Sequence, residues 1–355
     1  MKLYYWYITK HFFKNFIVIL LGVTAMFVLI NYLTYGSRIN GAFNQKISYM
    51  FYSWEHSLSI LYPLALVFGA IATKVQFVKN NTMGAMYSFG YTNKRLLLPV
   101  LMVSSIVYLI FVFLQTTSFA YAKDSADSFV GTGSKVGVPE KLFLKYNDTY
   151  VYIEKLDQVT KKIYGLSLFE IKDNKIKYTM KSPVGTYNGK SWILKDAVMK
   201  TNHYDGEMLQ KYSIKNYAQF STLNGYKPAV IDSVSDDGGS MKLLDAYETY
   251  KLLAKQNIDT TKIRASVYSK IISPMFIFGL IVLIFFKIPY LARYENMTRV
   301  ASIAIAISLL IWASFTGINF FGSNGVVLPE IASFVPIIIL SIFGFKSYFG
   351  KEMLA

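Results

Sequence analysis

The hydrophobic residues of this chain are gathered into six stretches that are almost free of charged side chains. Each stretch is about twenty residues long, and a helix of that length crosses roughly 30 Å of hydrocarbon. The pattern therefore predicts six membrane-spanning helices, three before and three after a long polar segment. The predicted spans cover residues 15–35, 57–77, 96–120, 266–292, 300–321 and 329–349.

The polar segment between the third and fourth spans, residues 121–262, has the composition of a domain that folds in water. It contains 17 of the 21 acidic residues, together with 21 lysines. Runs such as TYVYIEKL and KIYGLSLFEI alternate apolar and polar residues with the two-residue period of a strand. We therefore expect an antiparallel β domain, a sandwich or a jelly-roll-like fold. Near its end, MKLLDAYETYKLLAK has the spacing of a helix, and this helix leads back toward the membrane.

This pattern divides the chain into residues 1–120, the β domain at 121–262, and residues 263–355. The composition agrees with a membrane protein, because the mean hydropathy is +0.34 and 53% of the residues are hydrophobic. The first span is too long for a signal peptide and lacks a small-residue cleavage site, so we expect it to remain as an anchored helix.

Sequence motifs for catalysis or metal binding are not evident. His11, His56 and His203 have no ligand-like spacing, and cysteine is absent. The sequence GTYNGKS at residues 185–191 superficially resembles a phosphate-binding loop, but that motif needs four residues between its glycines and this stretch has three. Its Asn-Gly pair is instead typical of a hairpin turn. We expect no catalytic activity and no bound cofactor in this chain.

The basic residues predict the orientation in the membrane. If the N-terminus is cytoplasmic, the inner segments carry twelve lysines and arginines, whereas the two short outer loops carry only Arg38 and Lys46. Cytoplasmic loops carry the excess of basic residues. The chain is therefore expected to have both termini in the cytoplasm and the β domain outside.

The segment of residues 74–95, KVQFVKNNTMGAMYSFGYTNKR, joins the second and third spans on the inner side. It has four basic residues and no acidic one. Phe77, Met83, Met86 and Phe89 have helix-compatible spacing, and Gly90 would end the helix as a C-cap. Such a helix could dock a soluble partner or lie on the anionic membrane surface, and a solvated basic turn is the plainer alternative.

Several stretches in this order resemble one known family, the LptF/LptG permeases of the lipopolysaccharide-export ABC transporter. MGAMYSFGYTNKR fits the family's charged helical segment after the second span, and its GYT is closer to the LptG form. SKIISPMFIFGLIVLIFFKIPY resembles the start of the fourth span, and GVVLPEIASFVPIIILSIFG resembles the sixth. LSLFEIKDNKIKYTMKSPVGTYNGKSWILKDAVMKT resembles the outer domain. The resemblance covers essentially the whole chain.

The resemblance implies a non-catalytic permease subunit in the bacterial inner membrane, with a periplasmic β domain. Its implied partners are a homologous permease, a cytoplasmic ATPase dimer that binds the ATP, a single-span periplasmic subunit, a periplasmic bridge protein and lipopolysaccharide. No nucleic acid is implied. ATP binding would close the ATPase on the inner helices and squeeze a lipid cavity that opens to the outer leaflet.

Two groups of residues carry the implied contacts. The coupling segment at 74–95 would meet the ATPase, and residues near the outer end of the first two spans would meet lipid. The implied ATPase-coupling residues are Lys79, Asn80, Asn81, Thr82, Met83, Met86, Tyr87, Gly90, Tyr91 and Thr92. The implied lipid-binding residues are Asn31, Tyr35, Arg38, Lys46 and Phe68.

The chain departs from the family pattern at two places. Where the family usually has a glutamate that contacts the ATPase, this chain has Thr82, which implies a more neutral interface. Asn31 stands where the first span often carries a lysine, and Arg38 lies near the later basic pair of the family. Arg38 is therefore the best candidate for contact with lipid phosphates, and an ordinary interfacial anchor is the alternative.

Two other functions fit a membrane protein with an outer domain. One is a sensor, but the inner segments are too short to hold a signalling domain. The other is an ABC permease that performs mechanical work at the outer face, although its usual layout is one span, a large outer domain and three more spans. Association with a nucleotide-binding subunit separates both transporters from a sensor.

Overall fold

The computed structural model describes residues 3–39, 43–130, 140–157, 160–172, 175–205, 208–228, 230–231, 241–255, 259–291, 293 and 295–350. The chain forms two compact units. A helical unit comprises Met1–Gly36, Met50–Ala122 and Arg264–Ala355, and a second unit comprises Ser37–Tyr49 and Lys123–Ile263.

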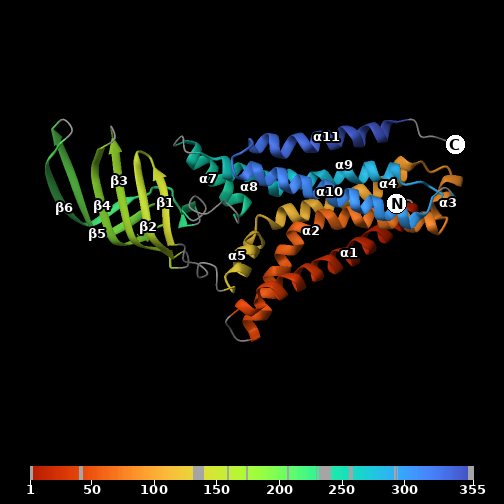
Figure 1. Ribbon diagram of the computed structural model, residues 1–355, viewed down its shortest axis with the longest axis horizontal. Helices are drawn as coiled ribbons and strands as arrows, with labels where there is room; N and C mark the ends of the chain where they lie inside the picture. The colour runs from red at the N-terminus through yellow and green to blue at the C-terminus, as the bar shows by residue number, and fades with distance from the viewer. Residues whose placement is uncertain are drawn as a thin grey trace. The chain divides into compact units, whose positions relative to one another are not determined.

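Among the described residues, six helices are long and apolar enough to span a membrane, which confirms the predicted number. Figure 1 shows them as the long ribbons of the helical unit. They are α1 (Leu3–Tyr35, continued by the 3-10 turn η1 at Gly36–Arg38), α2 (Phe43–Lys79), α4 (Asn93–Leu114), α8 with α9 (Thr261–Ile271 and Phe276–Lys287), α10 (Met297–Ser323) and α11 (Pro329–Phe349).

Several spans differ from the sequence-based prediction. The helices of the first and second spans begin well before residues 15 and 57, at Leu3 and Phe43. The third ends at Leu114 rather than near residue 120, and the short segments η2 (Ser118–Tyr121) and α5 (Ala122–Asp127) follow it. The fourth is interrupted between α8 and α9 by the 3-10 turn η3 (Ser273–Met275). Pro274 explains the interruption, because proline has no N–H for the helical ladder and its ring clashes with the preceding turn.

The spans pack closely where small residues face one another. A Cβ atom on Gly344 of α11 would lie 3.0 Å from the carbonyl oxygen of Gly279 in α9. In the same way, a Cβ atom on Gly69 of α2 would lie 3.1 Å from the Cα of Phe16 in α1. Small residues let helix backbones approach, and this contact replaces the hydrophobic driving force that lipid does not supply.

Polar side chains inside the helical unit bond across helices. Asn319 of α10 accepts hydrogen bonds at 3.0 Å from Ser273 of η3 and from Ser333 of α11. Asn15 of α1 donates to the Thr73 hydroxyl of α2 at 2.9 Å. In hydrocarbon an unpaired polar group is costly, so these bonds hold specific helices together.

The second unit contains the expected antiparallel β domain. Its described strands form one sheet in chain order, from β1 to β6. They do not divide between the two facing sheets of a sandwich or jelly roll, because each strand is joined to the next by a short connection and pairs with it directly. The strands are β1 (Glu140–Tyr146), β2 (Thr149–Asp157), β3 (Lys162–Lys172), β4 (Lys175–Tyr187), β5 (Trp192–Asp205) and β6 (Met208–Thr222).

One face of this sheet is buried. Val151, Leu168 and Met180 lie opposite one another on β2, β3 and β4, and each is fully buried or nearly so. Trp192 of β5 is also buried, and its indole N–H donates to the carbonyl oxygen of Tyr226 at 2.6 Å. The alternation of apolar and polar residues in the sequence thus places one set of side chains in a core.

The turn between β4 and β5 explains the GTYNGKS sequence. The Asn188 side chain accepts hydrogen bonds from the backbone N–H groups of Lys190 and Ser191, and Gly189 has φ 96°. This is a hairpin turn, as its Asn-Gly pair predicts, and not a nucleotide loop. The second expected turn, in KDNK, includes residues 173–174, which lie outside the described residues.

Helix α7 (Leu243–Lys255) follows the sheet in the second unit. The helix itself is as predicted, but its buried residues are Ala246, Thr249 and Leu253. Leu244, Tyr247 and Tyr250, which carry the apolar spacing in the sequence, are exposed. Lys227 donates to the Glu248 carboxylate of α7, and this bond raises the pKa of Lys227. Both side chains are about half exposed, so the pair contributes little to stability.

The glycine contact between α9 and α11 gives a test of helix packing. We expect Gly344→Ala to lower the free energy of unfolding by about 1–3 kcal/mol, because the new methyl group meets backbone that cannot give way. Gly22→Ala in α1 is the matched control, since a Cβ there meets nothing within 4 Å. Thermal unfolding of the purified protein in detergent compares the two. Equal midpoints would show that α9 and α11 are not in close contact.

Candidate functional site

The connection between the second and third spans is a helix–turn–helix and not one continuous helix. α2 continues to Lys79, and a tight turn at Asn80 and Asn81 leads into the short helix α3 (Thr82–Ser88). Asn81 has φ 56°, a left-handed conformation that asparagine tolerates better than most residues. The segment therefore changes direction immediately after α2.

The C-terminal end of α3 has the predicted glycine cap. The N–H of Gly90 donates to the carbonyl of Tyr87 at 2.8 Å, and the N–H of Tyr91 donates to that of Met86 at 3.2 Å. Gly90 has φ 76°. These two bonds form a Schellman motif, in which glycine takes the left-handed position. Thr92 is then the N-cap of α4, so the two helices are separated by only a few ordered residues.

One face of α3 is fixed to the helical unit. Met83 and Met86 are 1% and 9% exposed and belong to the main hydrophobic core. The Tyr87 ring meets the Tyr290 ring edge-on, with 5.3 Å between centroids. Because Tyr290 belongs to the connection between α9 and α10, α3 packs against that connection and is not an isolated turn.

Two more contacts lie in this region. A Cβ on Gly84 of α3 would lie 3.4 Å from a methyl carbon of Leu291 in the same connection, which is ordinary van der Waals contact. The Lys79 ammonium, at the end of α2, donates to the Thr298 hydroxyl in the first turn of α10 at 3.3 Å. The connection thus contacts α3, and the helix that follows it contacts the end of α2.

The other face of α3 is open to solvent. Phe89, which follows the last helical residue, is 80% exposed. Ala85 and Ser88 are also exposed, as are Asn80 and Asn81 in the preceding turn. Phe89 therefore leaves an aromatic ring uncovered beside small polar residues.

The ten predicted coupling residues therefore divide by their surroundings. Those at the surface can meet a partner, whereas the buried ones position the segment. Lys79, Asn80, Asn81 and Gly90 are exposed; Thr82, Tyr87, Tyr91 and Thr92 are partly exposed; Met83 and Met86 are buried. Phe89 was not among the predicted coupling residues, although an apolar residue directly before the Gly90 cap was a usable signal.

Other chain segments gather at the α3 end of the helical unit (Figure 1). The ring of Tyr4, near the start of α1, lies 4.3 Å from that of Tyr91. The Lys94 ammonium lies 5.0 Å from the ring centroid of Tyr348, near the end of α11. The first and last spans therefore meet the α2–α4 and α9–α10 connections at one end of the helical unit, as an even number of spans requires.

The predicted lipid-binding residues differ in their surroundings. Asn31 of α1 donates to the Ser53 hydroxyl of α2 at 3.3 Å, and Phe68 packs against the main core. Tyr35 is exposed at the end of α1. Arg38 is exposed and Lys46 is half-buried, and both belong to the second unit.

The described architecture defines a class of protein. Three spans, an inserted antiparallel β unit and three more spans make a multi-pass membrane protein with a large domain between its two helical halves. The family model "Lipopolysaccharide export system permease LptF/LptG" matches residues 6–348. The chain therefore belongs to the LptF/LptG family of permeases, as the resemblance indicated. That model joins both members and does not assign the chain to one of them. No curated protein matches the chain.

The two faces of α3 should respond differently to truncation. Met83→Ala is expected to lower the free energy of unfolding by about 2–5 kcal/mol, because it leaves a cavity in the core. Phe89→Ala should change it by less than about 0.5 kcal/mol, because the ring is already in solvent. Thermal unfolding of the two purified variants makes the comparison. A large loss of stability in Phe89→Ala would mean that the ring is packed.

Proposed function

We propose that this chain is a permease subunit that extracts lipopolysaccharide from the inner membrane and passes it to a periplasmic bridge, driven by a separate cytoplasmic ATPase. The observation that carries the proposal is the family match over residues 6–348, which includes all six spans and the β unit. The work is mechanical: ATP is hydrolysed by the partner, and this chain converts the movement into displacement of a lipid.

The proposed orientation has both termini and α3 in the cytoplasm. The excess of basic residues at the inner connections supports it. The gathering of the first span, α3 and the last span at one end is consistent with it. The β unit, inserted between the third and fourth spans, then lies in the periplasm.

The proposed contact with the ATPase is the open face of α3. Its buried methionines hold the helix to the core, so a force on its open face would reach the spans. Thr82 offers no carboxylate, and Phe89 supplies exposed apolar area beside the exposed amides of Asn80 and Asn81. The interface would therefore depend on apolar and hydrogen-bonding contacts more than on an ion pair.

The proposed lipid path involves the least covered helices. The spans α1, α10 and α11 are mostly uncovered, whereas α2 is mostly buried. The exposed apolar faces of α1 and α10 would meet acyl chains or a second, homologous permease. Arg38, exposed just beyond α1, would meet lipid phosphates through charge-assisted hydrogen bonds.

The proposed exit toward the bridge is an edge of the β sheet. Among the described strands, β1 and β6 are the two at the edges. An edge strand offers unpaired backbone groups, and another strand can add to it. The periplasmic bridge protein would continue the sheet in this way, and the single-span periplasmic subunit would help to align it.

Reconstitution tests the function as a whole. The chain is assembled in proteoliposomes with a homologous permease and a nucleotide-binding subunit, and ATP hydrolysis is measured with and without lipopolysaccharide. We expect stimulation by lipopolysaccharide and no stimulation by a phospholipid of similar charge. Failure of the chain to associate with any nucleotide-binding subunit would contradict the proposal.

Photo-crosslinking tests the two contacts separately. We expect a benzoylphenylalanine at Phe89 to form adducts with the ATPase, and the same residue at Arg38 to form adducts with lipopolysaccharide. Phe113, near the opposite end of α4 and 67% exposed, is the matched aromatic control and should form no ATPase adduct. A complex that assembles without adducts at Phe89 would refute the docking face while leaving the transport function standing.

A further inference from the structure

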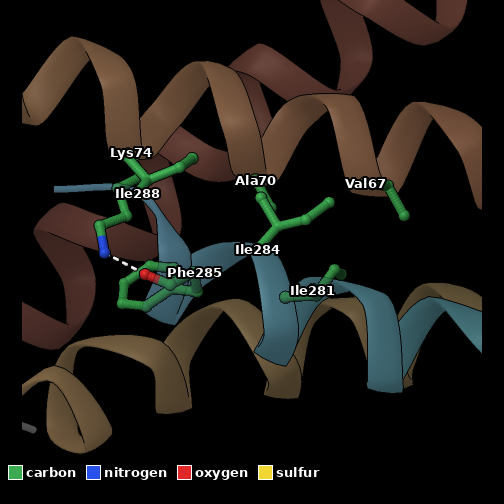
Figure 2. Close-up of a pocket in the computed structure, with 7 residues that line it drawn as sticks. All are labelled: Val67, Ala70, Lys74, Ile281, Ile284, Phe285 and Ile288. Atoms are coloured by element: carbon green, nitrogen blue, oxygen red, sulfur yellow. Dashed lines mark hydrogen bonds between the residues drawn. The ribbon is translucent and has the colours of Figure 1, made fainter. Parts of the chain in front are cut away.

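Lys74 is a basic residue inside the helical unit, and the proposed function gives it no role. It lies in α2 before the last turn and is 1% exposed. Its neighbours in one small cavity are Val67, Ala70, Ile281, Ile284, Phe285 and Ile288, all of them apolar (Figure 2). A charged group in such surroundings is costly, so ionisable residues within spans usually have a specific task.

The partner of Lys74 is the end of another span. Its ammonium donates a hydrogen bond to the backbone carbonyl of Phe285 and lies 4.3 Å from the centroid of the Phe285 ring (Figure 2). Among the described residues, this carbonyl is the only hydrogen-bond acceptor of the ammonium. Phe285 stands in the last turn of α9, which ends at Lys287.

The chemistry of a helix end explains why a cation fits there. The carbonyls of the last turn have no intrahelical N–H partner, and the helix dipole makes that end negative. A lysine from a neighbouring helix supplies both the missing hydrogen-bond donor and a positive charge. Lys74 therefore caps α9 from α2, across 211 residues of sequence.

The same lysine also lies beside α3. A second small cavity, with about 10 Å³ of free space, is bordered by Lys74, by Met83 of α3 and by Phe285 of α9. α3 is joined to α2 through the two-residue turn at Asn80 and Asn81. Through Tyr87 and Gly84, it also touches the connection that follows α9. The bond of Lys74 to Phe285 thus closes a ring of contacts through α2, α3 and the end of α9.

We propose that Lys74 is a positioning residue that fixes the end of α9 to α2, so that a displacement of α3 moves the fourth span with it. This role rests on the proposed function, in which the ATPase moves α3. An apolar residue at this position would not lower the stability of the fold, because replacing a buried charge by a hydrophobic group is often neutral or stabilising. Apolar side chains, however, would not fix the register of α9 against α2 as a bond to one carbonyl does.

The test uses Lys74→Met, which keeps an unbranched side chain one atom shorter and removes the ammonium. The chain has no cysteine, so a Gly84→Cys, Leu291→Cys pair reports whether the α9–α10 connection stays on α3. In the full complex during ATP turnover, we expect Lys74→Met to lower the disulfide yield of this pair. We expect lipopolysaccharide released per ATP hydrolysed to fall about fivefold, the lower range of coupling effects, while ATP hydrolysis continues.

The matched control is Lys287→Met. Lys287 is a lysine at the same end of α9, but it is exposed. This variant should change neither the disulfide yield nor the ratio of transport to hydrolysis. Thermal unfolding of both variants shows whether either one has lost its fold.

Two results would overturn the role of Lys74. One is an unchanged disulfide yield and an unchanged transport ratio in Lys74→Met. The other is a loss of stability that lowers hydrolysis and transport equally, which would mean that the residue only supports the fold. If no ATPase binds the wild-type chain, the proposed function fails instead. The disulfide yield in the permease alone then decides whether Lys74 holds α9 in place.

Discussion

Hydrocarbon offers no hydrogen-bond partner, and this single constraint decides how the spans of the chain are built and joined. Each backbone group must be satisfied within a helix, and each polar side chain must find its partner in the protein. Asn319 therefore gathers Ser273 and Ser333 from two other segments, and Lys74 finds the free carbonyl of Phe285. Some polar side chains, such as Thr24 and Ser104, bond to a carbonyl of their own helix, whereas those that bond to another helix tie the two together.

The same constraint explains how much of the fold was predictable. Lipid exposure requires long apolar windows, so the number of spans and their division into three and three could be predicted from composition. Alternation in the polar segment predicted strands, because half of each strand faces a core. The alternation could not predict that each strand pairs with the next one along the chain. The two-residue period of a strand is the same in this meander and in a jelly roll.

The position of α3 in the chain and its glycine cap could be predicted from the sequence. Which of its side chains are buried and which are exposed could not. Gly90 ends α3 as expected, because the left-handed cap is a local requirement. The spacing gave Met83 and Phe89 the same apolar character, yet one is buried and the other is exposed. Lys74 was counted among the basic residues of the inner side, and the sequence could not show that it is buried, since its surroundings are decided by packing against α9, more than two hundred residues away in sequence.

The break at Pro274 gives the fourth span two halves with different attachments. The first half, α8, is held by the ion pair of Arg264 with Glu330 at the start of α11. The second half, α9, is held by Lys74 and by the glycine contact with α11. Between them, η3 lacks the continuous ladder of α-helical hydrogen bonds that makes a helix stiff. The fourth span is thus two helical segments with separate anchors, and the proline between them divides the load that each anchor carries.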